Sequence, residues 1–364
     1  MRIGIDIHTI GAHQTGNETY IKNIVSNMND DHDLYLYYTK TNRENLPDWK
    51  ANFKKISPHN SLLRIPVSFP LALKRDKIDV AHFQYVIPPV SPCPTVVMIH
   101  DISYEFFPEF FHPLSRKRMQ LLIPYSARKS SHVLTVSEYS KQQIIKKYGI
   151  PEDKITVTYN GVSDNFRIIN DQGYIDTILQ RFSLTKPFIL AVGNLQPRKN
   201  IERLVRVYAN LKKLDKIEQD LVLVGKVDYK GHKIFDIIKD NNVEKFVKIT
   251  GYVNDEELVA LYNKADIFVY PSLYEGFGLP LIESMACGTP VITSNVSSLP
   301  EVAGEAALYI DPESDDDLED QLLKLSANND LKKLLVDKGI DQVKKFSWKK
   351  AAQDTTNIFE KIAI

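Results

Sequence analysis

Two glutamates separated by seven residues flank a short glycine-rich segment in the last third of the chain. The run Glu275-Gly-Phe-Gly-Leu-Pro-Leu-Ile-Glu283 follows an apolar stretch that ends at Tyr270. A helix is expected after the glycines, since proline is favoured in the first turn of a helix. Two helical turns separate the carboxylates, so both can lie on one face. Backbone N–H groups at such a helix start bind anions or polar oxygens.

Two adjacent cations, Arg198 and Lys199, form a second group suited to chemistry. They lie in the run Ala191-Val-Gly-Asn-Leu-Gln-Pro-Arg-Lys-Asn200, directly after another apolar stretch. Fixed positive charges between a strand and a helix suit a diphosphate, because they neutralise the bound phosphates and the departing group. The G-x4-G-K-[ST] spacing of a Walker A loop is absent from the chain, which disfavours a kinase or an ATPase.

Two segments nearer the N-terminus place polar residues after apolar ones. The stretch Val97-Met-Ile-His-Asp-Ile102 predicts a strand that ends at His100. A lone histidine there is most often structural, but the carboxyl end of a parallel strand is also where ligands bind. The following Asp101 can cap a turn. The loop Gly11-Ala-His-Gln-Thr-Gly-Asn-Glu-Thr-Tyr20 follows the first predicted strand and contains Gly16.

The elements that must position these segments alternate along nearly the whole chain. A β-α-β-α order favours parallel sheets covered by helices. A helix is predicted over 19–28, and capping boxes at Asn254 with Glu257 and at Ser298 with Glu301 begin two more. The segment 165–186 has little pattern and is interpreted as a linker. Strands are predicted at 2–7, 34–38, 80–83, 95–99, 132–136 and 154–158, and in a second series at 188–192, 221–224, 247–250, 267–270, 290–293 and 307–310.

Two such strand series predict two doubly wound domains, and the length of 364 residues suits two. Hydrophobic residues make up 43% and charged residues 25% of the chain, which excludes a disordered chain. No apolar run reaches the roughly 18 residues of a membrane span, and no signal peptide is recognised. The two cysteines, Cys93 and Cys287, exclude a disulfide framework and a structural zinc site, and fit a reducing cytosol.

The charges cancel overall but are segregated along the chain. Forty-six basic and 46 acidic residues give a net charge of zero, so no nucleic-acid partner is expected. Residues 112–150 contain eight basic residues and one acid, Glu138. Such a stretch is attracted to an anionic membrane at about 1 kcal/mol per suitably placed Lys or Arg; a solvated helix face explains it equally well. We therefore expect a cytoplasmic protein, with peripheral contact to the inner face of the membrane left open.

The segment around Glu275 resembles the E-x7-E element of the retaining glycosyltransferases of sequence family 4, and the resemblance runs over nearly the whole chain. It implies the GT-B fold, an α/β architecture with two doubly wound Rossmann-like domains that face a cleft. The expected acceptor-side domain comprises 1–168 with 346–364, and the expected nucleotide-sugar-binding domain comprises 169–345. The motifs P-R-K-N and E-G-F-G-L-P further resemble those of bacterial mannosyltransferases of O-antigen or capsule synthesis.

The resemblance also implies roles for single residues. Glu275 and His100 are expected as the catalytic residues that contact the donor sugar, and Glu283 is expected to hold the ribose hydroxyls. The expected substrate-binding residues are Arg198 and Lys199 on the diphosphate, Val253 near the nucleotide base, Gly16 in the loop that closes on donor and acceptor, and the backbone amides of Gly276, Phe277, Gly278 and Leu279 on the donor sugar and phosphate.

Two places depart from the family pattern. Many relatives have an arginine directly after the glycine of the phosphate loop, where this chain has Asn194, which leaves Arg198 and Lys199 as the main clamp. Common relatives have T-G-x-G-R-Y where this chain has Thr15-Gly-Asn-Glu-Thr-Tyr20. Glu18 therefore replaces a glycine, and it either orients an acceptor hydroxyl or favours the helix start.

These residues together predict a retaining, metal-independent transferase that moves a hexose, first of all mannose from GDP-mannose, to a glycan or lipid-linked acceptor. No cofactor is expected, since the nucleoside-diphosphate sugar is a substrate. The nearest D-x-D metal element, Asp315-Asp-Asp317, begins a predicted helix, where acids favour the dipole. A sugar-nucleotide epimerase and a non-catalytic sugar-nucleotide-binding protein stay open. A product formed without acceptor would identify the epimerase.

Overall fold

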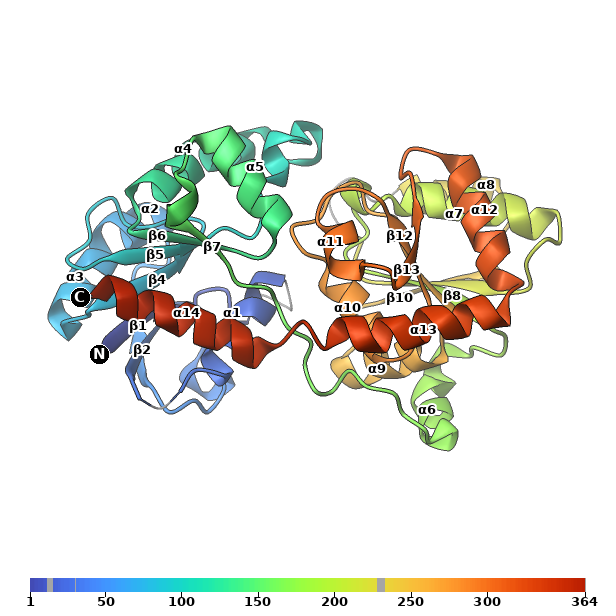
Figure 1. Ribbon diagram of the computed structural model, residues 1–364, viewed down its shortest axis with the longest axis horizontal. Coiled ribbons are helices and arrows are strands. Elements are labelled where there is room, and N and C mark those ends of the chain that lie inside the picture. Colours follow the sequence, from blue (N-terminus) through green and yellow to red (C-terminus); the bar gives the residue numbers. More distant parts are fainter. Residues whose placement is uncertain (12–15, 30, 228–232, 364) are drawn as a thin grey trace. The chain divides into compact units, whose positions relative to one another are not determined.

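The structure is a computed structural model that describes residues 1–11, 16–29, 31–227 and 233–363 (Figure 1). The chain forms two compact units. Unit 1 comprises Met1–Gly161 and Ser347–Ile364, and unit 2 comprises Val162–Phe346. The unit boundaries thus follow Gly161 and Phe346, whereas the expected boundaries followed residues 168 and 345.

The strands of unit 1 form a seven-stranded parallel sheet in the order β3-β2-β1-β4-β5-β6-β7. The strands are β1 (Arg2–Asp6), β2 (Asp33–Tyr38), β3 (Asn52–Lys55), β4 (Val80–Gln84), β5 (Thr95–Met98), β6 (His132–Thr135) and β7 (Ile155–Val157). The helices are α1 (Gly16–Ser26), α2 (Ser61–Leu63), α3 (Phe69–Asp76), α4 (Pro113–Lys129), α5 (Glu138–Tyr148) and α14 (Trp348–Ala363).

The terminal helix α14 completes unit 1 although it follows unit 2 in sequence. It packs against α1, β4 and β6, as Figure 1 shows. Its apolar face buries Trp348 and Phe359, which are 4% and 0% exposed. Where α14 begins, a Cβ on Gly161 would lie 2.1 Å from the backbone nitrogen of Trp348, so the two chain segments can touch only because residue 161 is glycine.

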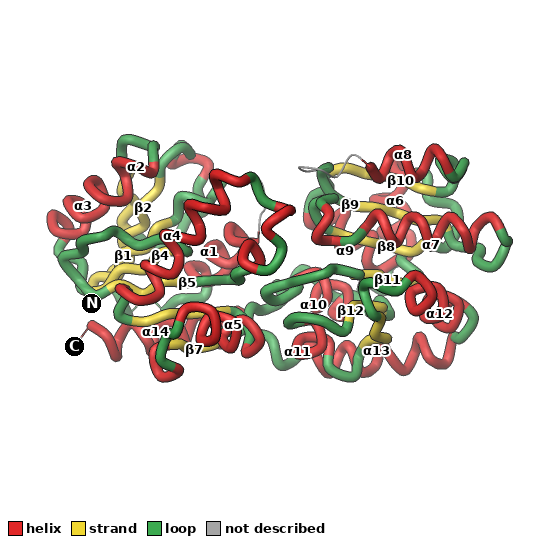
Figure 2. The backbone as a smooth tube through the Cα atoms, turned by 90° about the horizontal axis from the view of Figure 1, so that it is seen from above, coloured by secondary structure: helices red, strands yellow, loops and turns green. Residues whose placement is uncertain are grey.

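Unit 2 contains a six-stranded parallel sheet in the order β10-β9-β8-β11-β12-β13, of which Figure 2 shows the first five strands side by side. The strands are β8 (Phe188–Val192), β9 (Asp220–Val224), β10 (Val247–Gly251), β11 (Ile267–Tyr270), β12 (Val291–Ser294) and β13 (Ala307–Ile310). The helices are α6 (Gln172–Leu179), α7 (Ile201–Lys213), α8 (Lys233–Asp240), α9 (Asp255–Lys264), α10 (Leu279–Ala286), α11 (Leu299–Ala303), α12 (Asp315–Ser326) and α13 (Asn329–Val343).

Both sheets are doubly wound, which confirms the predicted fold class. The first strand of each unit lies inside its sheet: β1 lies between β2 and β4, and β8 lies between β9 and β11. The order of connections therefore reverses at β1 and at β8. In sheets of this kind, ligands bind beyond the carboxyl ends of the strands at the reversal. A ligand-binding site is therefore expected at the loops after β8 and β11 in unit 2.

Two elements, an edge strand and a helix, were not predicted from the sequence. The edge strand β3 was missed, because its sequence Asn-Phe-Lys-Lys has no alternation of apolar residues. The segment 165–186 is not a plain linker, since it contains α6, which Asp171 caps and which buries Ile175 and Leu179. None of the described helices combines the length and apolar character that crossing a bilayer requires.

Candidate functional site

The glycine-rich loop of unit 2 connects β11, which ends at Tyr270, to α10, which begins at Leu279. Gly278 precedes the helix with a φ of +103°, and a Cβ there would lie 3.1 Å from the Leu299 side chain. Both facts require glycine at this position. Phe277 is 4% exposed and packs edge-on against Phe346 at 5.4 Å between ring centroids. The loop is therefore held in one conformation, with Gly276 and Gly278 buried at the start of α10.

Ser298 holds this loop from the side of β12 and α11. Its hydroxyl donates to the carbonyl oxygens of Glu275 at 3.0 Å and Phe277 at 3.1 Å. The neighbouring Ser297 hydroxyl accepts from the Glu275 N–H at 3.0 Å. The predicted capping box at Ser298 is therefore wrong, since the Ser298 side chain makes no capping bond. The capping box of Asn254 with Glu257 is confirmed.

Ser298→Ala is expected to loosen the glycine-rich loop. The substitution removes a fully buried hydroxyl and leaves two carbonyl oxygens without this donor, which costs roughly 1–3 kcal/mol. Denaturant unfolding of the variant measures the loss, with the exposed Ser115→Ala as control. An unchanged free energy of unfolding in Ser298→Ala would show that the loop holds its conformation without this hydroxyl.

The basic loop follows β8 and is held in place by close backbone contacts. A Cβ on Gly225 would lie 2.0 Å from the carbonyl oxygen of Gly193, so the chain after β9 can approach the end of β8 this closely only because residue 225 is glycine. The short helix Pro197–Lys199 follows. The Arg198 carbonyl accepts from the N–H of Leu273 at 2.9 Å, and the Arg198 guanidinium donates to the Tyr274 carbonyl. Hydrogen bonds through Arg198 thus join the basic loop to the glycine-rich loop.

Glu275 binds both cations of the basic loop. Lys199 Nζ lies 2.6 Å from Glu275 Oε1, and Arg198 Nη1 lies 3.0 Å from Glu275 Oε2. Lys199 also donates to the hydroxyl of Tyr270 at 2.6 Å. Burial alone would raise the pKa of Glu275, but the charges of Arg198 and Lys199 outweigh it and lower the pKa to about 2. The carboxylate is ionised at neutral pH, and the three charges sum to +1.

The second carboxylate, Glu283, has different surroundings on α10. The Tyr262 hydroxyl of α9 donates to its Oε2 at 3.3 Å, and no described lysine or arginine forms an ion pair with it. Burial raises the pKa of Glu283 to about 7. The two glutamates of the E-x7-E element therefore differ at neutral pH: Glu275 is fully ionised, whereas Glu283 is about half protonated.

Glu283→Gln is expected to remove a pH dependence of stability. Since the pKa of Glu283 lies above the ordinary value of 4.5, the folded chain binds this proton more tightly than the unfolded chain. The resulting stabilisation is full below pH 4.5 and is lost as the pH rises through about 7. Between these values the parent should lose roughly 2–3 kcal/mol relative to the variant. Denaturant unfolding of both chains at pH 5 and pH 8 measures this, and parallel pH profiles would contradict it.

The remaining predicted residues lie in two places. Val253 is 5% exposed in the turn between β10 and α9 of unit 2. His100 and Gly16 belong to unit 1. His100 is 8% exposed beyond β5, and its Nε2 lies 2.8 Å from the amide oxygen of Gln84, which requires the proton on Nε2. Burial and the charge of His82 lower the pKa of His100 to about 3, so the ring is neutral at pH 7.

The N-terminal loop is described only at its two ends. Gly16 is the exposed first residue of α1, and no atom lies within 4 Å of the position of a Cβ there. The predicted loop residues 12–15 lie outside the described residues. Glu18 Oε1 accepts from the backbone N–H of Gly11 at 2.7 Å, so this carboxylate joins the two ends of the loop. This bond is a role that neither prediction for Glu18 included.

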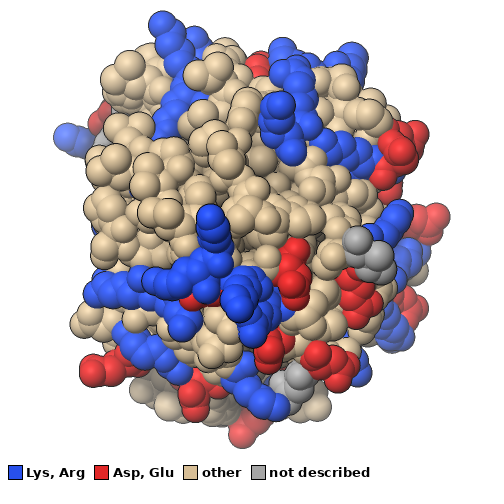
Figure 3. All heavy atoms as spheres, turned by 90° about the vertical axis from the view of Figure 1, so that its left-hand side faces the viewer, with Lys and Arg blue, Asp and Glu red and all other residues tan. Residues whose placement is uncertain are grey.

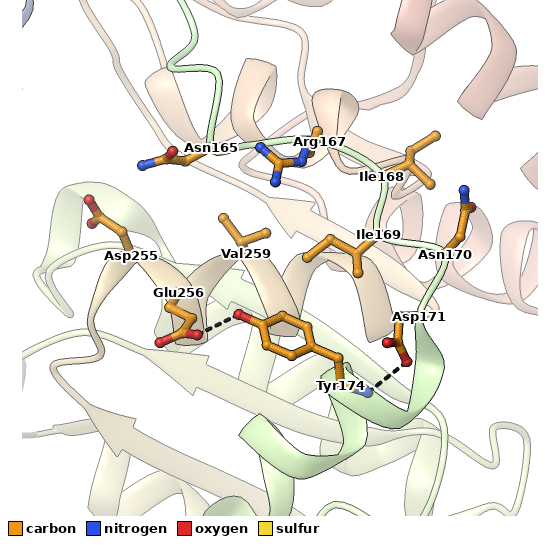
Figure 4. Close-up of a pocket in the computed structure, with 10 residues that line it drawn as sticks. All are labelled: Asn165, Arg167, Ile168, Ile169, Asn170, Asp171, Tyr174, Asp255, Glu256 and Val259. Atoms are coloured by element: carbon orange, nitrogen blue, oxygen red, sulfur yellow. Dashed lines mark hydrogen bonds between the residues drawn. The ribbon is translucent and has the colours of Figure 1, made fainter.

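A pocket of about 560 Å³ in unit 2 contains none of the predicted residues (Figure 4). The segment 165–171, α6 and α9 line it, and Figure 4 shows Tyr174 bound to Glu256 within it. Its lining includes three carboxylates, those of Asp171, Asp255 and Glu256, and one arginine, Arg167. A negative pocket repels a diphosphate. The positive cluster at Glu275 is the better place for one.

The first aspartate of the D-x-D element pairs with two arginines. Asp315 begins α12 and pairs with Arg203 and Arg206, whose guanidinium groups use its carboxylate oxygens. Within the described ranges, no group of three or more His, Cys, Asp or Glu side chains is arranged to hold a metal ion.

Comparisons with known proteins agree with this geometry. The family description Glycosyltransferase Family 4 matches residues 15–166, and Glycosyl transferases group 1 matches residues 178–342. The chain is 35% identical over 267 residues to O-antigen chain mannosyltransferase B of Escherichia coli, covering 73% of this chain and 70% of that protein. It is 31% identical over 276 residues to O-antigen chain mannosyltransferase RfbU of Salmonella typhimurium, covering 74% and 72%.

A solved structure has the same fold. Sucrose-phosphate synthase from Thermosynechococcus elongatus superposes with a TM-score of 0.80 at 19% identity, covering 99% of this chain and 98% of that one. This likeness covers the residues of both units and shows their fold. The chain belongs to glycosyltransferase family 4, with a group 1 domain, and is a glycosyltransferase of the GT-B fold.

Proposed function

We propose that this enzyme transfers mannose from GDP-mannose to a glycan or lipid-linked acceptor in polysaccharide assembly, with retention of the anomeric configuration and without a metal ion. The observation that carries the proposal is the cluster of Arg198, Lys199 and Glu275 beside the start of α10. It lies beyond the carboxyl ends of β8 and β11, where a doubly wound sheet binds its ligand. Mannose is favoured by the two relatives named above, both of them O-antigen mannosyltransferases.

The charges of the cluster support a role in stabilising the leaving group. In the proposed reaction, the bond between the sugar C1 and the diphosphate oxygen breaks while C1 bonds to the acceptor oxygen on the same face. The acceptor proton passes to an oxygen of the departing phosphate. Arg198, Lys199 and the backbone at the start of α10 stabilise the negative charge that develops on the diphosphate. Because Arg198 and Lys199 stabilise the charge on the leaving diphosphate, the proposed mechanism needs no metal ion.

Glu275 is suited to positioning rather than to nucleophilic attack. Both of its oxygens are bound by cations, and its pKa of about 2 makes it a weak base. A second carboxylate that could complete a double-displacement pair, Glu283, lies on α10 and is bound by Tyr262, whereas Glu275 lies in the loop before that helix. The carboxylate of Glu275 instead holds the sugar hydroxyls and orients the two cations.

A nucleotide-sugar panel with a purified acceptor glycan tests the proposal. We expect GDP-mannose to raise the melting temperature more than UDP-linked hexoses, and we expect an α-linked product from this α-linked donor. The transfer rate should be the same with and without EDTA. A rate that disappears in EDTA and returns with Mn²⁺ would contradict the metal-independent mechanism, and a β-linked product would contradict retention.

We further propose that unit 1 contacts an anionic membrane through the basic segment 112–150. Two leucines of α4 are largely exposed, Leu114 at 73% and Leu121 at 72%, and basic residues lie between them. Flotation with anionic liposomes should show binding at low salt that weakens at physiological salt. Lys117→Glu should reduce the bound fraction several-fold, since it replaces attraction with repulsion. An absence of binding at both salt concentrations would contradict the proposal.

A further inference from the structure

The carboxyl edge of β1, β2 and β3 in unit 1 collects charged side chains that the proposed donor chemistry does not use. His8 follows the end of β1 by two residues, and Lys40 follows the end of β2 by two. His59 lies in the loop after β3, and Arg64 follows it in sequence. The three strands are parallel neighbours, so their ends meet at one edge of the sheet.

Arg64 is the buried member of this group. The residue is 4% exposed, and its Nε has no hydrogen-bond partner among the described residues. The guanidinium forms no ion pair in the described chain, although it lies near the Phe69 ring, 6.0 Å from the centroid. The hydroxyl of Thr39, at the end of β2, is 5% exposed and has no described partner either. A buried donor without an acceptor calls for an explanation, and a ligand that supplies the acceptor is one such explanation.

His8 is held in a fixed orientation beside Arg64. Its Nδ1 lies 2.8 Å from Asp6 Oδ2, and its backbone N–H donates to Asp6 Oδ1 at 3.1 Å. Asp6 is 5% exposed, whereas the His8 side chain is 29% exposed, so Nε2 of His8 is the ring nitrogen left for a ligand. Burial alone would raise the pKa of Asp6, but His8 and the Arg64 charge lower it.

His59 is another polar residue at this edge of the sheet. His59 follows β3, and Lys40 follows the neighbouring parallel strand β2, so both lie at the same edge of the sheet. Burial and the positive charges of Lys40, Arg64 and His8 lower the pKa of His59. Arg64 and Lys40 carry two positive charges, and Asp6 carries one negative charge. The edge is therefore positive even when both histidines are neutral.

We propose that this edge of unit 1 binds a phosphate group of the acceptor, with Arg64, Lys40, His8 and His59 as its ligands. The inference deepens the proposed function, since it names an anionic acceptor for that reaction. A guanidinium fork and a lysine ammonium match the oxygens of a phosphate ester, and His8 Nε2 adds a donor when the ring is protonated.

The apolar surface beside this edge gives the phosphate two sources to distinguish. Leu62, Leu63, Val67 and Leu71 follow His59 in sequence and are 71%, 53%, 47% and 64% exposed. Figure 3 shows the side of unit 1 on which α3 lies, where a broad area without charged side chains has lysines and arginines above and below it. A lipid-linked phosphate would place its chain on such a surface, whereas a free phosphate ester would not need it.

Calorimetric titration of the full chain with inorganic phosphate and with decyl phosphate, below its micellar concentration, tests the proposal. Lys40→Ala and His59→Ala change exposed residues, and each should weaken binding of both probes by about fivefold. Arg64→Met should weaken it further. Saturating GDP is present throughout, so that the donor site is occupied. Lys22→Ala removes an exposed lysine of α1, serves as the matched control and should keep the parental affinity.

The outcomes separate this site from the donor site. Parent-like binding in both Lys40→Ala and His59→Ala would overturn the proposal, as would binding of both probes that saturating GDP abolishes. These two exposed variants decide the matter if Arg64→Met does not fold. Tighter binding of decyl phosphate that falls in Leu62→Ser supports a lipid-linked source, and equal binding of both probes supports a free phosphate ester. The titration measures phosphate affinity and requires no sugar transfer. The proposed transferase activity can therefore fail its own test without affecting this result.

Discussion

Lys199→Ala is expected to lower the rate of sugar transfer by about 10³-fold, because removing one preorganised charge from a leaving group has effects of this size. The Lys199 ammonium is 12% exposed and binds both Glu275 Oε1 and the Tyr270 hydroxyl. Without it, the departing diphosphate keeps one cation instead of two. Steady-state rates with saturating donor measure the effect, because a loss in the transition state lowers kcat as well as kcat/KM.

The same substitution should lower stability. It leaves Glu275 buried with Arg198 as its one ion-pair partner, and breaking a buried pair costs about 3–5 kcal/mol. Lys239→Ala, which removes an exposed lysine of α8, is the matched control for charge and should keep the parental rate and stability. A parental transfer rate in Lys199→Ala would sink the assignment of this loop to the diphosphate.

Much of the fold could be predicted from the sequence, since strands buried on both faces are continuous apolar runs. The strands at 188–192, 267–270 and 307–310 were predicted at the bounds that the structure has. The edge strand β3 is exposed and its residues have no apolar alternation, so no pattern marks it. The helix α6 was missed for a related reason, because it buries few apolar residues.

The site could be predicted as a set of residues but not as a set of contacts. The spacing of Glu275 and Glu283 predicted one carboxylate at the loop mouth and the other further along the same face. Nothing local shows that Glu275 binds Lys199, 76 residues earlier, and the adjacent Arg198. Ser298 has the sequence of a capping box, and only the approach of α11 to the glycine-rich loop redirects its hydroxyl. Long-range pairing of this kind depends on sheet order, which hydrophobic periodicity does not determine.

The zero net charge of the chain says little about the site, because charge acts over short distances. At the Debye length of about 8 Å, distant residues are screened from the diphosphate. What matters locally is one carboxylate between two cations, all three at most 14% exposed. The carboxylate oxygens of Glu275 occupy positions beside Arg198 and Lys199 that phosphate oxygens of the donor would also occupy. The carboxylate therefore weakens diphosphate binding while it orients the clamp.

Glu275→Gln should for this reason separate binding from transfer. The amide keeps the shape of the side chain but raises the charge of the cluster from +1 to +2, so GDP should bind about tenfold more tightly, which corresponds to about 1.4 kcal/mol. Transfer should fall by about 10²-fold, because the sugar hydroxyls and the cations lose the carboxylate that positions them. The melting temperature should be lower than that of the parent without GDP and should rise more when GDP is added, since the nucleotide replaces the lost negative charge.

Calorimetric titration with GDP, together with rates of transfer, measures both effects in one preparation of the variant. Glu305→Gln makes the same chemical change at an exposed carboxylate of unit 2, where Lys338 lies 3.0 Å away, and should alter neither quantity. Weaker binding of GDP in Glu275→Gln would show that the carboxylate holds the cations in a geometry that the nucleotide needs. Parental transfer would show instead that Glu275 takes no part in positioning the sugar. If Glu275 both competes with the diphosphate for the two cations and positions the sugar, Glu275→Gln must bind GDP more tightly and transfer sugar more slowly.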